Sequence, residues 1–177
     1  MYDIFVQAIG FAAVILFIIS FQIKSNRALF ITQLMGSAFF MTQFLLMGAY
    51  SGMISLIAIV IRNALLIKVR DWPWVKSKKT MIVFILICIG CSMFTWNGPM
   101  SLLPLWAMIG TTVTYWTDNA QKIRLDILLF DVPGWMIYDA IIGSWGGVLN
   151  EIITLASVLV SIWRYGWKSM DDPNSGF

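Results

Sequence analysis

The chain has 177 residues, of which 59% are hydrophobic and 12% are charged, and its formal net charge is +3. Soluble domains carry about 25% charged residues, so this composition predicts a polytopic membrane protein with almost no domain outside the bilayer. The sequence has no histidine, which excludes histidine metal sites, Ser-His triads and histidine proton relays. The basic balance does not indicate nucleic-acid binding, because no basic patch is interleaved with exposed aromatic residues.

Hydrophobic runs of roughly 15–21 residues recur along the chain, near the length that spans a bilayer. They predict seven transmembrane helices, at residues 4–21, 28–48, 52–68, 80–96, 100–116, 127–143 and 147–165. The sixth run is the least regular, because it contains Asp131, Pro133, Gly134 and Asp139. Its Pro-Gly pair is a candidate for a helix kink.

The distribution of Lys and Arg predicts the orientation of these helices. With the N-terminus outside, the inside regions are 22–27, 69–79, 117–126 and the C-terminal tail. Those regions and the adjoining helix ends hold eleven of the twelve Lys and Arg residues, and the twelfth, Arg62, lies toward the inner end of its helix. The outside connections at 49–51, 97–99 and 144–146 have none. The positive-inside rule therefore predicts an N-out, C-in protein.

Two glycine-flanked turns indicate an internal repeat. Gly48 and Gly52 flank the turn between the second and third helices, and Gly143 and Gly147 flank the turn between the sixth and seventh, at an offset of 95 residues. We therefore predict a 3+1+3 arrangement: a first three-helix unit at 1–68, a linker loop and helix at 69–99, a second unit at 100–165, and a short cytoplasmic tail at 166–177. Parallel repeats of this kind are one plan of membrane transporters.

This plan resembles the SWEET, SemiSWEET and PQ-loop superfamily of small-solute carriers. The first unit carries the similarity in Ile9-Gly10, in Phe21-Gln22 before Lys24-Ser25-Asn26, and in the glycines of its turn. More closely, the chain is similar to the bacterial inner-membrane YgjV family. The residues that carry this second resemblance are Ile61-Arg62-Asn63, Leu102-Leu103-Pro104, Trp135-Met136-Ile137, Gly143-Ser144-Trp145-Gly146-Gly147, Glu151 and Ile162-Trp163-Arg164.

The resemblance implies a multi-pass protein of the bacterial inner membrane that is a carrier and not an enzyme, by analogy of fold. It implies no particular substrate. Phe21 stands where those carriers have the proline that kinks the first helix. Asn63 falls where a substrate-facing asparagine would lie, but the position of its partner is occupied by Val158, so a sugar-type asparagine pair is absent.

Arg62 and Asp131 are the two ionisable residues nearest the inner ends of the predicted helices. At 1.5 Å per residue they lie about 9 Å and about 6 Å from those ends, so we expect them to form an inner ion pair or gate. The alternative is that Arg62 extends to the inner headgroups and favours the helix C-terminus there.

Asp139 and Glu151 each lie about 6–7 Å from the outer end of their helices, which a short turn connects. Two carboxylates at one depth cannot both stay ionised without a cation, so we expect them to share a proton or to hold a cationic group. The alternative is that Glu151, with Asn150, favours the positive end of its helix while Asp139 reaches the outer water.

Polar and aromatic residues at helical spacing are candidates for lining a cavity: Gln33, Ser37, Thr42, Gln43, Trp106, Thr111, Thr112, Thr114, Trp135 and Tyr138. Substrate contacts would come from Asn63, Trp135 and Tyr138, with Asp139 and Glu151 handling the proton or cationic group. The alternative for each residue is packing between helices.

Cys88 and Cys91 have the C-x-x-C spacing, but they lie inside an apolar helix without a histidine or a second cysteine pair. We expect them to pack, and we expect neither a metal nor a cofactor. The expected partners are the lipid bilayer and a small polar solute. Two competing interpretations are a non-transporting accessory or assembly protein, which predicts no central cavity, and a thiol oxidoreductase, which predicts reactive Cys88 and Cys91.

Overall fold

The computed structural model describes residues 2–22, 26–68, 72–117 and 119–167, and all of its regular elements are helices. The long helices are α1 (Tyr2–Gln22), α2 (Asn26–Leu46), α3 (Tyr50–Ile67), α4 (Lys78–Phe94), α5 (Leu102–Trp116) and α8 (Trp145–Tyr165). Between α5 and α8 the chain forms α6 (Ala120–Asp126), η3 (Ile127–Asp131) and α7 (Val132–Ile142) in direct succession. Short 3-10 turns, η1 (Pro73–Lys76) and η2 (Pro99–Ser101), precede α4 and α5.

The helix formed by α6, η3 and α7 begins seven residues earlier than the predicted start at residue 127. Asn119 accounts for the earlier start, because its side chain accepts a hydrogen bond of 2.9 Å from the backbone N–H of Lys122 and so caps the helix. Most of the predicted connection 117–126 is therefore helical. Asp131 lies eleven residues, about 16 Å, from this helix start, which is deeper than the predicted 6 Å.

η3 is a single π-helical turn that stands just before Pro133. The N–H of Val132 donates to the carbonyl of Ile127, five residues back. Proline has no N–H to donate, and π turns occur mostly as single turns inside α-helices. The predicted disturbance near Pro133-Gly134 therefore includes a π turn, after which the chain continues directly into α7.

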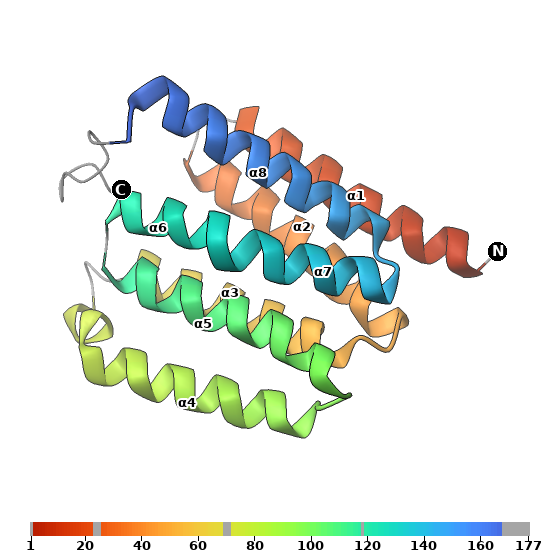
Figure 1. Cartoon of the computed structure of the whole chain (residues 1–177), viewed down its shortest axis with the longest axis horizontal. Coiled ribbons are helices and arrows are strands. Elements are labelled where there is room, and N and C mark those ends of the chain that lie inside the picture. Colours follow the sequence, from red (N-terminus) through yellow and green to blue (C-terminus); the bar gives the residue numbers. More distant parts are fainter. Residues whose placement is uncertain (1, 23–25, 69–71, 118, 168–177) are drawn as a thin grey trace.

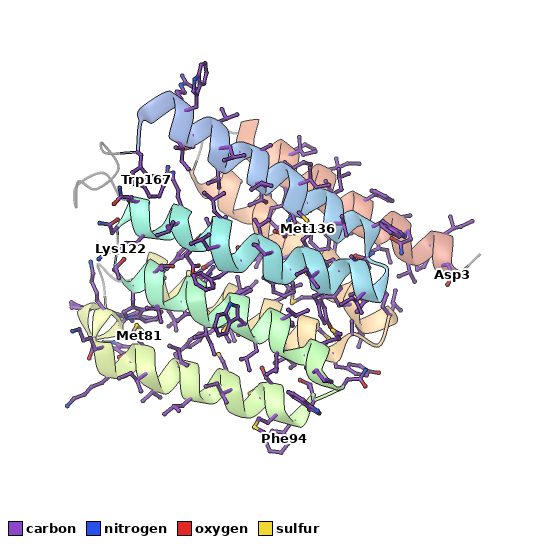
Figure 2. The ribbon with its side chains drawn as sticks, in the orientation of Figure 1. Asp3, Met81, Phe94, Lys122, Met136 and Trp167 are labelled. Carbon is purple, nitrogen blue, oxygen red and sulfur yellow. The ribbon has the colours of Figure 1, made fainter. Side chains whose placement is uncertain are left out.

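Six helices form a closed ring in the order α1, α2, α3, α5, α7 and α8, with α8 packing back on α1. α4 stays outside this ring and packs on α3 and α5, and Figure 1 shows it along one edge of the bundle. The N-terminus, the α2–α3 turn and the α7–α8 turn lie at the same end of the bundle (Figure 1). Figure 2 shows Asp3 and Phe94 toward that end and Lys122 and Trp167 toward the other.

The outside of the bundle is apolar, while several polar side chains are buried. Leu86, Phe94 and Trp163 are among the large apolar side chains that are exposed, whereas Arg62 and Asp139 are buried. This is the distribution expected of helices in lipid. By length and composition, the described helix Trp145–Arg164 could cross a membrane, and the apolar stretches Asp3–Ile19, Leu34–Leu46 and Tyr50–Leu66 are shorter.

The two glycine turns have the same backbone structure. Gly48 and Gly143 have φ of 69° and 75°, a left-handed conformation that favours glycine. The next residue in each turn, Ala49 or Ser144, donates its N–H to a carbonyl five residues back at 2.8 Å. Positions 95 residues apart in the two turns therefore make equivalent backbone hydrogen bonds, in addition to having similar sequences.

Candidate functional site

A cavity of about 360 Å³ lies inside the ring of six helices. Its lining includes side chains from α1, α2, α3, α5, α8 and the continuous helix of η3 and α7. Six of the seven predicted site residues line it, namely Arg62, Asn63, Asp131, Trp135, Asp139 and Glu151. The seventh, Tyr138, is buried elsewhere.

One face of the continuous helix supplies three of these side chains. Asp131, Trp135 and Asp139 are four residues apart, so they follow one another on the same side of the helix. Trp135 stacks on Phe44 of α2 with ring centroids 6.2 Å apart and an angle of 17° between the planes. This helix therefore presents a carboxylate, an aromatic ring and a second carboxylate in sequence along the cavity.

Arg62 is buried and bonded to neutral partners. Its Nη1 donates to the hydroxyl of Thr111 at 2.7 Å, its Nε donates to Oδ1 of Asn63 at 3.2 Å, and its guanidinium lies 4.6 Å from the centre of the Tyr115 ring. Only 3% of its surface is exposed, so it does not extend to the headgroups as the alternative supposed. Asp131 shares the cavity, yet the described contacts of Arg62 include no ion pair with it.

Asp139 is buried beside the start of α8. A Cβ on Gly147 would collide with its carboxyl group, so the absence of a side chain at Gly147 is what allows α7 and α8 to approach here. The carboxylate is 2% exposed, and its Oδ1 has no hydrogen-bond partner. Asp139 therefore faces the cavity and not the outer water, contrary to the alternative.

Glu151 lies one helical turn beyond Gly147 on the same face of α8. It is buried, and its Oε1 accepts a hydrogen bond of 3.2 Å from Nδ2 of Asn150. Asn150 and Thr154 also line the cavity. Asp139 and Glu151 thus both line the cavity where α7 and α8 meet.

Tyr138 connects two parts of the bundle and does not line the cavity. Its hydroxyl lies 3.0 Å from Oγ of Ser51 and accepts the N–H of Gly52, also at 3.0 Å. Gln43 stands 95 residues before Tyr138, and its Oε1 accepts a hydrogen bond of 3.1 Å from Ser144. Tyr138 therefore bonds to the start of α3 after the α2–α3 turn, and Gln43 bonds to the α7–α8 turn.

The remaining polar candidates divide between cavity and packing. Ser37 and Thr111 line the cavity, while Thr42 and Thr114 donate to carbonyls of their own helices, and the side chain of Gln33 lies outside the described residues. Trp106 is exposed at the surface.

Sequence reasoning missed Tyr115, which lines the cavity, and Asp126, which is 5% exposed and packs on Gly110. The missed helix start at Asn119 is what placed Asp126 in a loop.

Cys88 is buried against Ala58 and Met108, where α3, α4 and α5 meet, and Cys91 is exposed. Both thiols are free and neither lines the cavity. Within the described ranges, Cys, Asp and Glu side chains form no group of three that could hold a metal ion.

Residues 4–169 match the Imp-YgjV family, which is described as bacterial inner membrane protein. The match covers nearly the whole chain, so the protein belongs to this family. No curated protein and no solved structure matches the chain.

Proposed function

We propose that this member of the bacterial inner membrane protein family is a small-solute carrier that works by alternating access. The observation that carries the proposal is the cavity of about 360 Å³, which lies within the helix ring and is lined by Arg62, Asp131, Asp139 and Glu151. Charged groups inside a membrane bundle are costly, and they mark solute or ion pathways. An accessory protein has no need of such a cavity, so the carrier is the favoured function.

The helix contacts support two repeated three-helix units. α1 packs on α2 and α8, and α5, its counterpart at the offset of 95, packs on α7 and α3. The matching turns add to this correspondence. Residues 1–68 and 100–165 then form the two moving units, and α4 connects them from outside the ring. In the N-out orientation the glycine turns face outward.

The contacts between the units suggest which end is closed. At the end with the glycine turns, Tyr138 bonds to Ser51 and Gly52, and Gln43 bonds to Ser144. Toward the other end of α3, Asn63 and Ala64 line the cavity and are also exposed. These contacts support a cavity that is closed at the end with the glycine turns; with the N-out orientation predicted from the sequence, this is the inward-facing state of the proposed carrier.

The test is uptake by proteoliposomes that contain the purified protein, screened over sugars, amino acids, amines, vitamins and nucleosides. Once a solute is found, we expect Glu151→Gln to lower its uptake at least tenfold and to alter its pH dependence. Ser157→Ala is the matched control on the same helix, because Ser157 is exposed and its hydroxyl only donates to Ile153. Uptake and pH dependence that are unchanged in Glu151→Gln would remove Glu151 from the mechanism. The absence of uptake for every solute would contradict the carrier itself.

A further inference from the structure

The charge inside the cavity is unevenly distributed. Among the described lining residues Arg62 is the one basic side chain, while Asp131, Asp139 and Glu151 carry carboxyl groups. Arg62 lies ten residues beyond Gly52 on α3, about 15 Å from the level where Gly52 touches Tyr138. Asp131 lies eight residues, about 12 Å, from Asp139. Arg62 and Asp131 therefore both lie toward the inner end of the cavity.

The outer part of the cavity keeps two carboxylates without a cation. The carboxyl group of Asp139 occupies the space next to Gly147, and Glu151 is one turn away on the same face of α8. Cβ positions one turn apart on a helix are separated by about 5–6 Å, and the carboxyl of Asp139 fills the place that a Cβ on Gly147 would take. Asp139 is 2% exposed and Glu151 is 8% exposed, and Oδ1 of Asp139 has no partner. Two buried carboxyl groups in such proximity either share a proton or bind a cationic group, and the described residues that line the outer part of the cavity include no Lys or Arg.

Aromatic rings complete this part of the wall. Phe40, Phe44 and Trp135 line the cavity, and their rings form a continuous series with centroids 6.3 and 6.2 Å apart. Aromatic faces attract organic cations and cover methylene chains. Such an aromatic wall does not favour a bare metal ion, because hard cations are bound by oxygen ligands.

We propose that the cavity binds a short linear aliphatic diamine, with one ammonium on Asp139, the other on Glu151 and the methylene chain against the aromatic wall. An extended chain advances roughly 1.25 Å per bond for bonds of about 1.5 Å. Diamines with three or four methylenes therefore place their nitrogens about 5–6 Å apart, close to the rise of one helical turn, about 5.4 Å, that separates Gly147, beside the Asp139 carboxyl, from Glu151. This assignment deepens the proposed function, because it names the solute class of the same site.

The experiment measures binding and needs no transport. Thermal unfolding of the purified protein in detergent is followed against α,ω-diamines with two to eight methylenes, against n-butylamine, and against MgCl2 at equal ionic strength. We expect the apparent affinity to peak at three or four methylenes and to exceed that of n-butylamine at least tenfold. Asp139→Asn and Glu151→Gln should each reduce the diamine affinity to that of the monoamine. Asp126→Asn is the matched control, a buried carboxylate outside the cavity, and should keep the affinity within twofold.

Several results would overturn the assignment: no peak with chain length, equal affinity for the monoamine, or stabilisation by Mg²⁺ as large as that by the diamine. The dependence of affinity on diamine chain length is measured on the unmodified protein, so this test remains valid even if a variant fails to fold. Uptake of another solute without diamine binding would contradict the diamine site and would still support the proposed carrier function. Diamine binding with no solute moved by the proteoliposomes would support the site and contradict the carrier.

Discussion

Tyr138 offers the most direct test of how the two proposed units are held together. Its hydroxyl lies 3.0 Å from Oγ of Ser51 and 3.0 Å from the backbone nitrogen of Gly52. Gly52 is in the first turn of α3, where backbone N–H groups have no partner within the helix. Replacing Tyr138 with Phe keeps the ring and removes only the acceptor, so the buried N–H of Gly52 loses its partner.

The expected cost follows from this geometry. A buried donor left without a partner costs about 1–3 kcal/mol, and the hydroxyl of Ser51 can rotate to another acceptor, so it adds little. For a chain of 150–250 residues, 1 kcal/mol lowers the midpoint of thermal unfolding by about 2–4 °C. Tyr138→Phe should therefore unfold roughly 2–12 °C below the unmodified protein in the same detergent.

The matched control is Tyr50→Phe at the same end of α3. Tyr50 is 50% exposed, and a surface substitution of this kind changes stability by no more than about 0.5 kcal/mol. Unfolding followed by tryptophan fluorescence measures both variants. If Tyr138→Phe and Tyr50→Phe unfold at the same temperature, the hydroxyl of Tyr138 does not hold the two units together, and the reasoning is refuted.

Three further substitutions test the packing and the cavity. Gly147→Ala should destabilise the protein by about 1–3 kcal/mol, because the added Cβ collides with the carboxyl of Asp139. Gly90→Ala is the control, because Gly90 has open space around it, and this variant should be neutral or stabilising. Thermal unfolding measures both variants. Gly143→Ala should cost about 1–2 kcal/mol in the same assay, since its φ of 75° disfavours a side chain; equal stability of this variant and Gly90→Ala would contradict that account. Arg62→Lys should reduce uptake of any transported solute several-fold although the positive charge is kept. The reason is that lysine lacks the planar set of donors with which Arg62 contacts two side chains at once. Unchanged uptake would mean that Arg62 contributes only its positive charge.

Much of the local structure can be predicted from the sequence, because it depends on the types of neighbouring residues. An apolar run of sufficient length predicts a helix wherever it lies, and six of the seven predicted helices begin and end within about two residues of the observed ones. The exception is the sixth, because capping by Asn119 depends on one side chain and leaves no trace in the hydrophobic pattern. The turns at Gly48 and Gly143 were readable for the same local reason, since glycine adopts positive φ at little cost.

Some residues of the candidate site could be predicted from the sequence. Arg62, Asp139 and Glu151 stand out in the sequence because charge is rare in apolar helices, and the structure places all three at one cavity. The burial of Asp126, which lies outside the cavity, was missed because the predicted helix began one residue after it. Tyr138 was expected in the cavity because it is aromatic and neighbours Asp139, but successive residues on a helix face different directions.

The sequence by itself determined that this chain is a set of apolar helices joined by glycine turns, with a few acidic and basic residues inside. Those properties depend on residue type and spacing, which act over one or two helical turns. Only the tertiary structure decided which side chains face one another. Asp139 and Glu151 share a wall because Gly147 allows close approach of α7 and α8, and Tyr138 turns away to bond with α3. Hydrogen bonds between helices join residues up to 138 positions apart, and no local pattern specifies which faces of two helices will meet.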